Sequence, residues 1–193
     1  MPKKLILLIG APGSGKTTDA EVIAGNHKEI TSYSLGSLLV EEAKKDTKLG
    51  KINRDFISKG DLVPTAIVID TLCSAIQNAP TDVVLIDGFP RKNKQMKFFG
   101  DLVKDVNRVD LVSVIEIRVS RETARQRVEA SLEEFEKDVF CHAMDLYEGT
   151  IKEIEEFYNH DGLLRVINGE RKASEVIEEI DEFLQYKVAL APA

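Results

Sequence analysis

Residues 10–17, GAPGSGKT, constrain this chain more than any other part of its sequence. They follow a short run of branched apolar residues that predicts a strand, and they precede a stretch whose spacing predicts a helix. Glycines at positions 10, 13 and 15 let the backbone turn and bring successive amide N–H groups close to an anion. The pattern GxxxxGK[ST] between a strand and a helix therefore predicts a loop that holds the phosphates of a nucleoside triphosphate, with ATP the expected one.

Thr17 and Asp87 are candidate ligands of the metal ion that accompanies a triphosphate. We expect Lys16 to place its ammonium on the β and γ phosphates, and Thr17 to offer its hydroxyl to Mg²⁺. The apolar run 83–87 ends in Asp87, and a strand-terminal aspartate near such a loop commonly supports Mg²⁺ or its waters. The alternative for Asp87 is a helix-capping role. We expect Mg²⁺ bound with ATP and no structural metal.

Strand-like runs alternate with helical patterns along the whole chain, without a linker or a repeat. The predicted strands are 5–9, 29–33, 83–87, 111–119 and 163–167. The predicted helices are 16–25, 35–45, 51–58, 64–78, 93–106, 121–158 with a break, and 173–186. Parallel strands need crossovers, so this alternation predicts one α/β domain over 1–193, a P-loop NTPase fold with a five-stranded parallel sheet flanked by helices.

The segment after residue 128 has its own pattern. Ser131 and Glu134 have the spacing of a capping box, which predicts that a helix restarts near Leu132. Apolar side chains then recur every three to four residues or a multiple, and we interpret this stripe as core packing on one long helix. Its members are Phe135, Val139, Leu146, Thr150, Ile154 and Phe157.

Composition limits the classes of protein that fit. The 193 residues are 43% hydrophobic and 31% charged with a net charge of −7, which argues against a broad nucleic-acid-binding face. The apolar run 5–9 is too short for a membrane span, and Cys73 and Cys141 follow no zinc or disulfide spacing. We therefore expect a cytoplasmic monomer that binds neither membranes nor nucleic acid. The histidines are expected at the surface, since they show no metal spacing; they are His27, His142 and His160.

Acidic residues concentrate in one part of the chain. Between Val128 and Tyr158 there are ten acids and only two bases, Lys137 and Lys152, a local charge of −8. The simplest interpretation of such an acidic segment is a helix face exposed to solvent. The same segment contains no arginine.

Four motifs together resemble one enzyme family. Residues 87–91, DGFPR, with Gln95 four positions later, resemble the DGFPR...Q segment of adenylate kinases, and GAPGSGKTT at the start is similar to theirs. Residues 60–64 with 67–68 resemble the family's G-x-LVP...IV stretch, and residues 34–39 resemble its STGDLLR helix start. The resemblance runs from Lys4 to about Tyr186 and is closest to the short-lid adenylate kinases of some bacteria.

The resemblance implies a core sheet with two lobes, an NMP-binding lobe at 34–63 and a short, degenerate lid at 128–138. It implies transfer of the γ-phosphoryl group of Mg·ATP to a nucleoside monophosphate, AMP, forming two ADP. Carried over by position, the catalytic residues are Lys16, Asp87, Arg91 and Arg127. The ATP-binding residues are Gly13, Ser14, Gly15, Lys16, Thr17, Thr18, Arg127 and Arg171. The AMP-binding residues are Leu35, Asp61, Leu62, Val63, Gly88, Phe89, Arg91 and Gln95.

The chain departs from the resemblance at several phosphate-binding positions. Leu35, Ser37 and Val40 stand where the family has Thr, Asp and Arg. The lid arginines are absent as well, and the residues found in their place are Ala130, Ser131, His142 and Ala143. Two alternatives to an active adenylate kinase therefore stay open: a catalytically impaired nucleotide-binding paralogue, and a kinase with a different acceptor. Replacement cations could come from Arg118, Arg121, Arg125 or Arg171.

Overall fold

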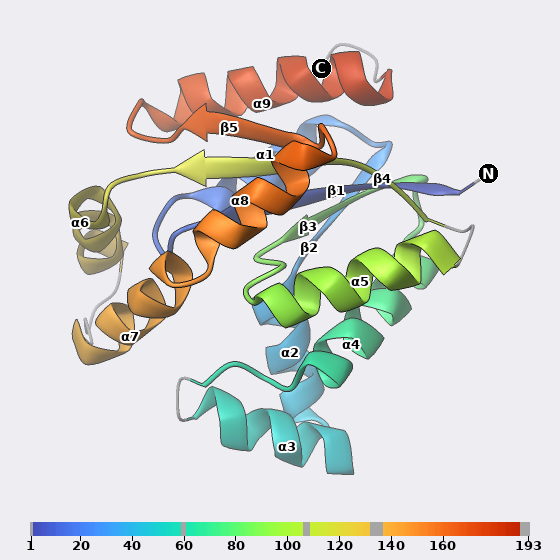
Figure 1. The fold of residues 1–193 in the computed structure, drawn as a ribbon, viewed down its shortest axis with the longest axis vertical. Helices are drawn as coiled ribbons and strands as arrows, with labels where there is room; N and C mark the ends of the chain where they lie inside the picture. Colours follow the sequence, from blue (N-terminus) through green and yellow to red (C-terminus); the bar gives the residue numbers. More distant parts are fainter. Residues whose placement is uncertain (1, 59–60, 106–108, 132–136, 190–193) are drawn as a thin grey trace.

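A computed structural model describes residues 2–58, 61–105, 109–131 and 137–189, and it has one parallel sheet in the middle (Figure 1). The strands are β1 (Lys3–Gly10), β2 (Ile30–Ser34), β3 (Val83–Asp87), β4 (Val109–Arg118) and β5 (Leu164–Asn168). Their order across the sheet is β2-β3-β1-β4-β5, and each neighbouring pair is parallel. The predicted fold class, a five-stranded α/β P-loop fold, is confirmed.

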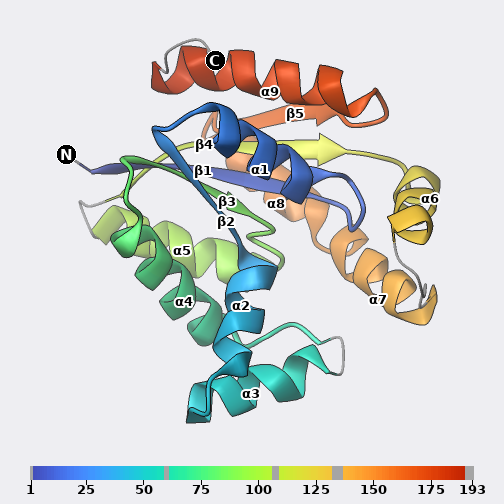
Figure 2. The same cartoon turned by 180° about the vertical axis from the view of Figure 1, so that it is seen from behind.

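Helices cover both faces of this sheet. They are α1 (Lys16–Asn26), α2 (Leu35–Lys44), α3 (Lys48–Ile57), α4 (Thr65–Asn78), α5 (Asn93–Asp105), α6 (Arg121–Ser131), α7 (Lys137–Glu148), α8 (Ile151–His160) and α9 (Ala173–Val188). Alternate residues of β1 point to opposite faces, so Ile6 and Leu8 pack with α1 and α9, while Leu5 and Leu7 pack with α4, α5 and α8. Figure 2 shows α1 in front of the sheet, on the side opposite α5 and α8.

The register of the sheet brings the predicted site residues to one edge. Leu8 of β1 and Ser34 of β2 are both aligned with Asp87 of β3, so β2 and β3 end level with Leu8, two residues before the end of β1. The loop that follows β1 therefore begins beside Asp87, although 70 or more residues separate them in sequence. Ligands of open parallel sheets bind at this carboxyl edge.

The prediction of one long helix beyond residue 132 is wrong. The chain turns between α7 and α8, where the N–H of Gly149 donates to the Asp145 carbonyl (3.0 Å) and that of Thr150 to the Tyr147 carbonyl (3.1 Å). Val139 is 52% exposed, so the apolar stripe is not a continuous core face.

The structure does not support the predicted capping box at residues 131–134, because Ser131 is not the N-cap of a helix. This residue is the last of α6, and its hydroxyl donates to the Val128 carbonyl (3.0 Å). Leu132, Glu134 and Phe135, with the middle of the predicted lid, lie outside the described residues, as does Gly60 of the predicted NMP-binding lobe.

The prediction of a surface position for His27 is also wrong, whereas His142 and His160 are exposed as expected. His27 is only 2% exposed and pairs with Asp181 of α9. The charged neighbours Lys28 and Glu29 are exposed, which gave the local sequence a surface character. His27 itself lies where the end of α1 packs against α9.

No helix in the described ranges is long and apolar enough to cross a membrane.

The packing of α9 on the sheet predicts a large stability effect for one substitution. Ile180 is fully buried in the cluster that joins α1, α9 and the sheet. Replacing it by alanine should lower the free energy of unfolding by about 2–5 kcal/mol, because the cavity cannot close completely. Urea denaturation of Ile180→Ala checks this, with the exposed Glu178→Ala on the same helix as control. Equal midpoints for the two variants would contradict the assignment of α9 to the core.

Candidate functional site

The loop after β1 depends on glycines that no other residue can replace without strain. Gly13 and Gly15 have φ values of 78° and 97°, in the left-handed region. A Cβ on Gly13 would lie 2.5 Å from the Ala124 carbonyl oxygen of α6, and a Cβ on Gly10 would lie 2.6 Å from the Ile117 carbonyl oxygen of β4. The loop is therefore pressed against β4 and α6, and α1 starts directly after it at Lys16. Its backbone N–H groups and the start of α1 together form a site for an anion.

Lys16 lies across this loop. Its ammonium donates to the Ala11 carbonyl (3.0 Å). Burial lowers the pKa of Lys16 to about 8, although the nearby Asp87 carboxylate favours the charged form; Arg91 adds to the lowering. A cation held in such poorly solvated surroundings gains strongly from an anionic partner, and a phosphate group at the loop would supply one.

Thr17 and Asp87 meet as the sequence predicts. The Thr17 hydroxyl donates to Oδ2 of Asp87 (2.5 Å), and Oδ1 of Asp87 is buried with no hydrogen-bond partner in the described part of the chain. Both residues line a hollow of about 260 Å³ between α1, α2 and the ends of β2 and β3. Mg²⁺ prefers hard oxygen ligands, so a hydroxyl beside an unsatisfied carboxylate oxygen fits this ion. No three His, Cys, Asp or Glu side chains of the described residues are placed to hold a metal by themselves, so the phosphates and waters would complete the shell.

Asp19 is a buried carboxylate that the sequence analysis missed. It is 3% exposed on the first turn of α1, behind the loop. Burial raises the pKa of Asp19 to about 6; Arg127 opposes this shift, and Asp87 adds to it. The signal in the sequence was weak, because an aspartate early in a helix is ordinary.

A cleft of about 370 Å³ extends from the loop to α2 and to α7–α8. It brings together most of the predicted acceptor-binding residues, from four separate segments. Those that line it are Leu35, Asp61, Leu62, Val63, Gly88, Arg91 and Gln95. Phe89 does not line it, because its ring is fully buried and packs edge-to-face on Phe99, with 5.1 Å between the ring centroids.

Arg91 is held at the floor of the cleft by its neighbours in sequence. Its Nε donates to the Gly88 carbonyl (2.8 Å), and its backbone N–H donates to Oε1 of the buried Gln95 (2.8 Å). Arg91 is exposed and lines the cleft. Desolvation by the protein around the guanidinium lowers the pKa of Arg91 below its ordinary value, against the effect of Asp87, and leaves the residue charged.

The other two arginines predicted at the site differ in position. Arg127 of α6 donates to the carbonyls of Ser14 (3.1 Å) and Gly169 (2.7 Å), so it joins the phosphate loop to the turn after β5. Arg171 instead donates to the Asn168 carbonyl (3.2 Å) and pairs with Glu179 of α9, away from the cleft.

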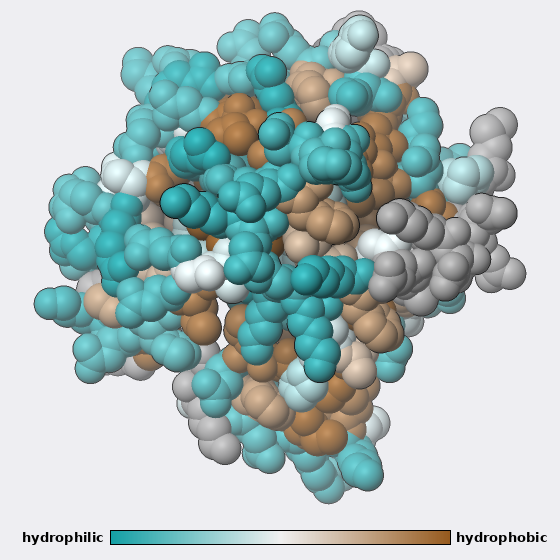
Figure 3. All heavy atoms as spheres, viewed as in Figure 1, coloured by the Kyte–Doolittle hydropathy of each residue, from teal (hydrophilic) through white to brown (hydrophobic). Residues whose placement is uncertain are grey.

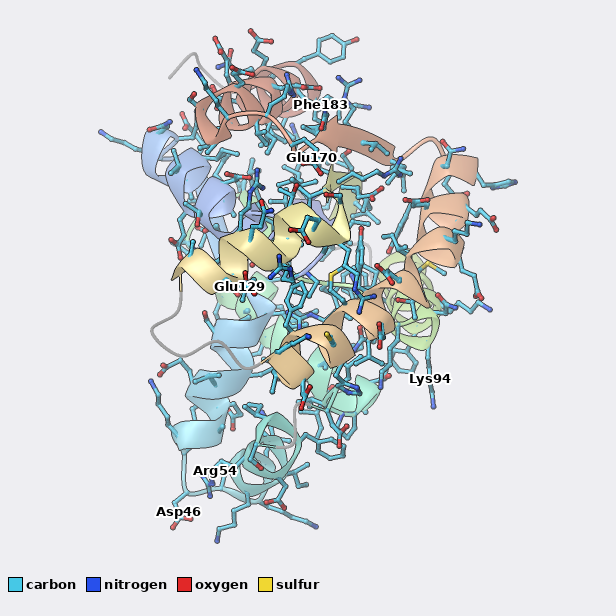
Figure 4. The ribbon with its side chains drawn as sticks, turned by 90° about the vertical axis from the view of Figure 1, so that its left-hand side faces the viewer. Asp46, Arg54, Lys94, Glu129, Glu170 and Phe183 are labelled. Carbon is cyan, nitrogen blue, oxygen red and sulfur yellow. The ribbon has the colours of Figure 1, made fainter. Side chains whose placement is uncertain are left out.

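Figure 4 shows Glu170 close to the start of α6, where its carboxylate accepts hydrogen bonds from Ser120 and Thr123.

The sequence analysis also missed one wall of the cleft, which consists of residues on one face of α7 and α8 and the turn between them. They are Ala143, Leu146, Tyr147, Thr150, Ile151 and Ile154. The three-to-four spacing that we interpreted as core packing is partly the spacing of this wall. In the space-filling view, hydrophobic residues border the gap between the region of α7 and the region of α2 and α3 (Figure 3).

Among the described residues, none of the carboxylates of α7 and α8 lines the cleft. The acidic side chains of these two helices therefore lie away from it. Asp145 and Glu148 pair with Arg121 of α6, both at 2.8 Å. Glu155 pairs with Arg118 of β4 (2.5 Å), which also binds the buried Glu116 (2.8 Å). The hydrogen bonds to Glu116 and Glu155 raise the pKa of Arg118 above its ordinary value.

Comparison with known proteins places these features in one family. The family model for adenylate kinase matches residues 8–163. The chain is 48% identical to an adenylate kinase of Sulfurovum sp. (strain NBC37-1), with 96% of the chain and 100% of the relative covered. It is 45% identical to an adenylate kinase of Nautilia profundicola, with 97% and 100% covered, and 47% identical to that of Helicobacter hepaticus, with 96% and 100% covered. Together with the parallel sheet and the phosphate loop beside Asp87, these matches show that the chain belongs to the adenylate kinase family.

Proposed function

We propose that the chain transfers the γ-phosphoryl group of Mg·ATP to AMP and forms two molecules of ADP. The observation that carries this proposal is that adjacent residues of the phosphate loop and α1 line both the cleft and the hollow beside Asp87. Lys16 lines the cleft, while the adjacent Thr17 lines the hollow with Asp87. A triphosphate on the loop would thus present its γ-phosphorus to the cleft and its metal to the carboxylate.

The donor half of the reaction would be held by the loop. The amides of residues 13–18 and the ammonium of Lys16 would hold the phosphates, and Mg²⁺, when bound, would neutralise charge on the β and γ oxygens. Thr17 and Asp87 would hold the ion or its waters. Arg127 contacts the Ser14 carbonyl and would fix the loop from the side of α6.

The acceptor half would lie in the cleft, between the NMP-binding lobe at 34–63 and the wall formed by α7 and α8. A phosphate oxygen of AMP would attack the γ-phosphorus, and the bond to the bridging oxygen of ADP would break. The transition state spreads negative charge over its oxygens, so Arg91 and Lys16 would contribute by fixed positive charge and not by covalent chemistry.

A second candidate is a nucleotide-binding protein that has lost turnover. One observation favours it: among the described residues that line the cleft, the cations are Lys16 and Arg91 alone. Transfer from labelled ATP to AMP, CMP, UMP and GMP separates the candidates. Formation of a labelled diphosphate from AMP supports the kinase, and saturable ATP binding without any transfer supports the second candidate.

Removing the Lys16 ammonium should damage transfer far more than folding. For Lys16→Met we expect kcat/KM with AMP to fall by about 10²- to 10³-fold, the size of effect found when one fixed donor to a developing charge is lost. A coupled assay for ADP measures this. Lys28→Met, at an exposed position just after the end of α1, is the matched control and should retain full activity. Undiminished turnover in Lys16→Met would refute the assignment.

The unsatisfied oxygen of Asp87 predicts a metal-dependent defect. In Asp87→Asn, the gain in ATP affinity on adding Mg²⁺ should shrink, whereas ATP affinity in excess EDTA should not fall, because the loop amides and Lys16 remain. Calorimetric titration with and without Mg²⁺ tests this. Asp82→Asn, an exposed position just before the same strand, serves as control. A uniform loss of ATP affinity with and without Mg²⁺ would point to a structural role for Asp87 instead.

A further inference from the structure

The acceptor part of the cleft is formed by two apolar helix faces. On α2, the lining residues are Leu35, Gly36, Leu39 and Val40, which recur at helical spacing. On the opposite side the lining comes from α7, α8 and the turn between them, beginning at Ala143. Neither face carries a cation in its described residues. A phosphate group between them would find apolar side chains and few hydrogen-bond donors.

Positive charge in the cleft is confined to its floor. Lys16 and Arg91 both come from the edge of the sheet, and the only other charged residue among the described lining is Asp61, a carboxylate. Lys16 lies on the phosphate loop, where the donor's own phosphates would occupy it. Arg91 is thus the one side-chain cation left for the phosphate of an acceptor, as far as the described residues go.

The remaining arginines near the cleft are already engaged. Arg118 and Arg121 are each held between two carboxylates, and Arg125 pairs with Glu122 (2.8 Å) and Glu129 (2.5 Å) on its own helix. Arg54 of α3 donates to the carbonyls of Ala43 and Lys45 at the far end of that lobe (Figure 4). Moving any of them to the acceptor would break these interactions and leave carboxylates or carbonyls without their donors.

We infer that, among the described residues, Arg91 alone holds the phosphate of an acceptor nucleotide, and that the apolar walls of α2 and α7–α8 provide most of the acceptor affinity through the nucleoside. The inference rests on the proposed function, because it concerns the acceptor of that same reaction. The uncharged nucleoside adenosine then lacks only the contact to Arg91 and binds the acceptor site about 10- to 100-fold more weakly than AMP. The site recognises the nucleoside mainly through apolar contacts. It discriminates only weakly between a nucleotide and the nucleoside without its phosphate.

The expected discrimination follows from the strength of one charged contact. A single hydrogen-bonded contact to a charged group corresponds to a factor of about 10 to 100 in affinity. Two or three such cations around one phosphate would multiply to a far larger ratio. The ratio of adenosine to AMP dissociation constants therefore counts the cations that serve the acceptor phosphate.

Calorimetric titrations of the full chain measure this ratio, with the donor site filled by Mg²⁺ and an ATP analogue that has a methylene bridge between its β and γ phosphorus atoms. We expect AMP to bind about 10- to 100-fold more tightly than adenosine. In Arg91→Gln the two ligands should bind equally, with the dissociation constant of adenosine unchanged. A ratio above about 1,000 in the wild-type chain, or a preference for AMP that survives Arg91→Gln, would overturn the inference.

A gain-of-charge variant provides a test that does not depend on the folding of Arg91→Gln. Val40 lines the cleft and is 42% exposed, so an arginine can be accommodated there. Val40→Arg should raise the ratio of the adenosine to the AMP dissociation constant by about 10- to 100-fold, because the new cation meets only the phosphate, while any loss of apolar contact affects both ligands. The control is Val22→Arg on α1, at a position 39% exposed and outside the cleft, which should change neither affinity. Equal behaviour of Val40→Arg and Val22→Arg would refute the inference.

The two proposals fail differently in these experiments. If labelled ATP yields no ADP from any nucleoside monophosphate and AMP does not bind, the proposed kinase function fails. If ADP is formed but adenosine binds more than about 1,000-fold more weakly than AMP, the kinase function stands and the single-cation acceptor site is wrong.

Discussion

The close contact of the phosphate loop with β4 and α6 is the constraint on which the rest of the site depends. A side chain at Gly10 or Gly13 would collide with the Ile117 or Ala124 carbonyl, and neither carbonyl can move without disturbing its strand or helix. The backbone therefore passes where only glycine fits. Lys16 and Thr17 follow at once on α1, so their positions are set by the loop. Arg127 completes the clamp by joining the loop to the turn after β5.

Ion pairing explains how a strongly acidic segment can stand beside a phosphate site. The arginines of β4 and α6 bind the carboxylates of α7 and α8 outside the cleft, at Asp145, Glu148 and Glu155. Exposed pairs of this kind contribute little stability singly. They do pair three of the ten carboxylates of the segment, on the side away from the cleft. The same pairing removes these arginines from the set available to bind phosphate, so one arrangement accounts both for the tolerated acidity and for the scarcity of cations in the cleft.

The sequence predicted the features that local chemistry dictates. Strand runs, the phosphate loop and the meeting of Thr17 with Asp87 follow from periodicity, glycine spacing and parallel register, and the structure has all of them. Features that depend on the partner of a side chain could not be predicted in this way. His27 has exposed charged neighbours, yet α9, about 150 residues later, covers it. Helical spacing predicted core packing correctly for Ile154, which is 2% exposed in the core cluster. The same spacing placed Leu146 in the core, yet Leu146 borders the cleft, because periodicity cannot tell a face that packs on a core from one that lines a cleft.

The two halves of the cleft respond differently to substitution because different atoms form them. In the proposed reaction, backbone amides in a tightly packed loop would bind the donor, so most side-chain changes elsewhere would leave that half intact. The acceptor half is formed by side chains on helix faces, some of them as exposed as Val40, and these positions can change without a cavity or a clash in the core. A chain with this fold can therefore keep its triphosphate site and its stability while the charge that meets the acceptor changes one residue at a time. Acceptor preference is the property of this site that is least constrained by the fold.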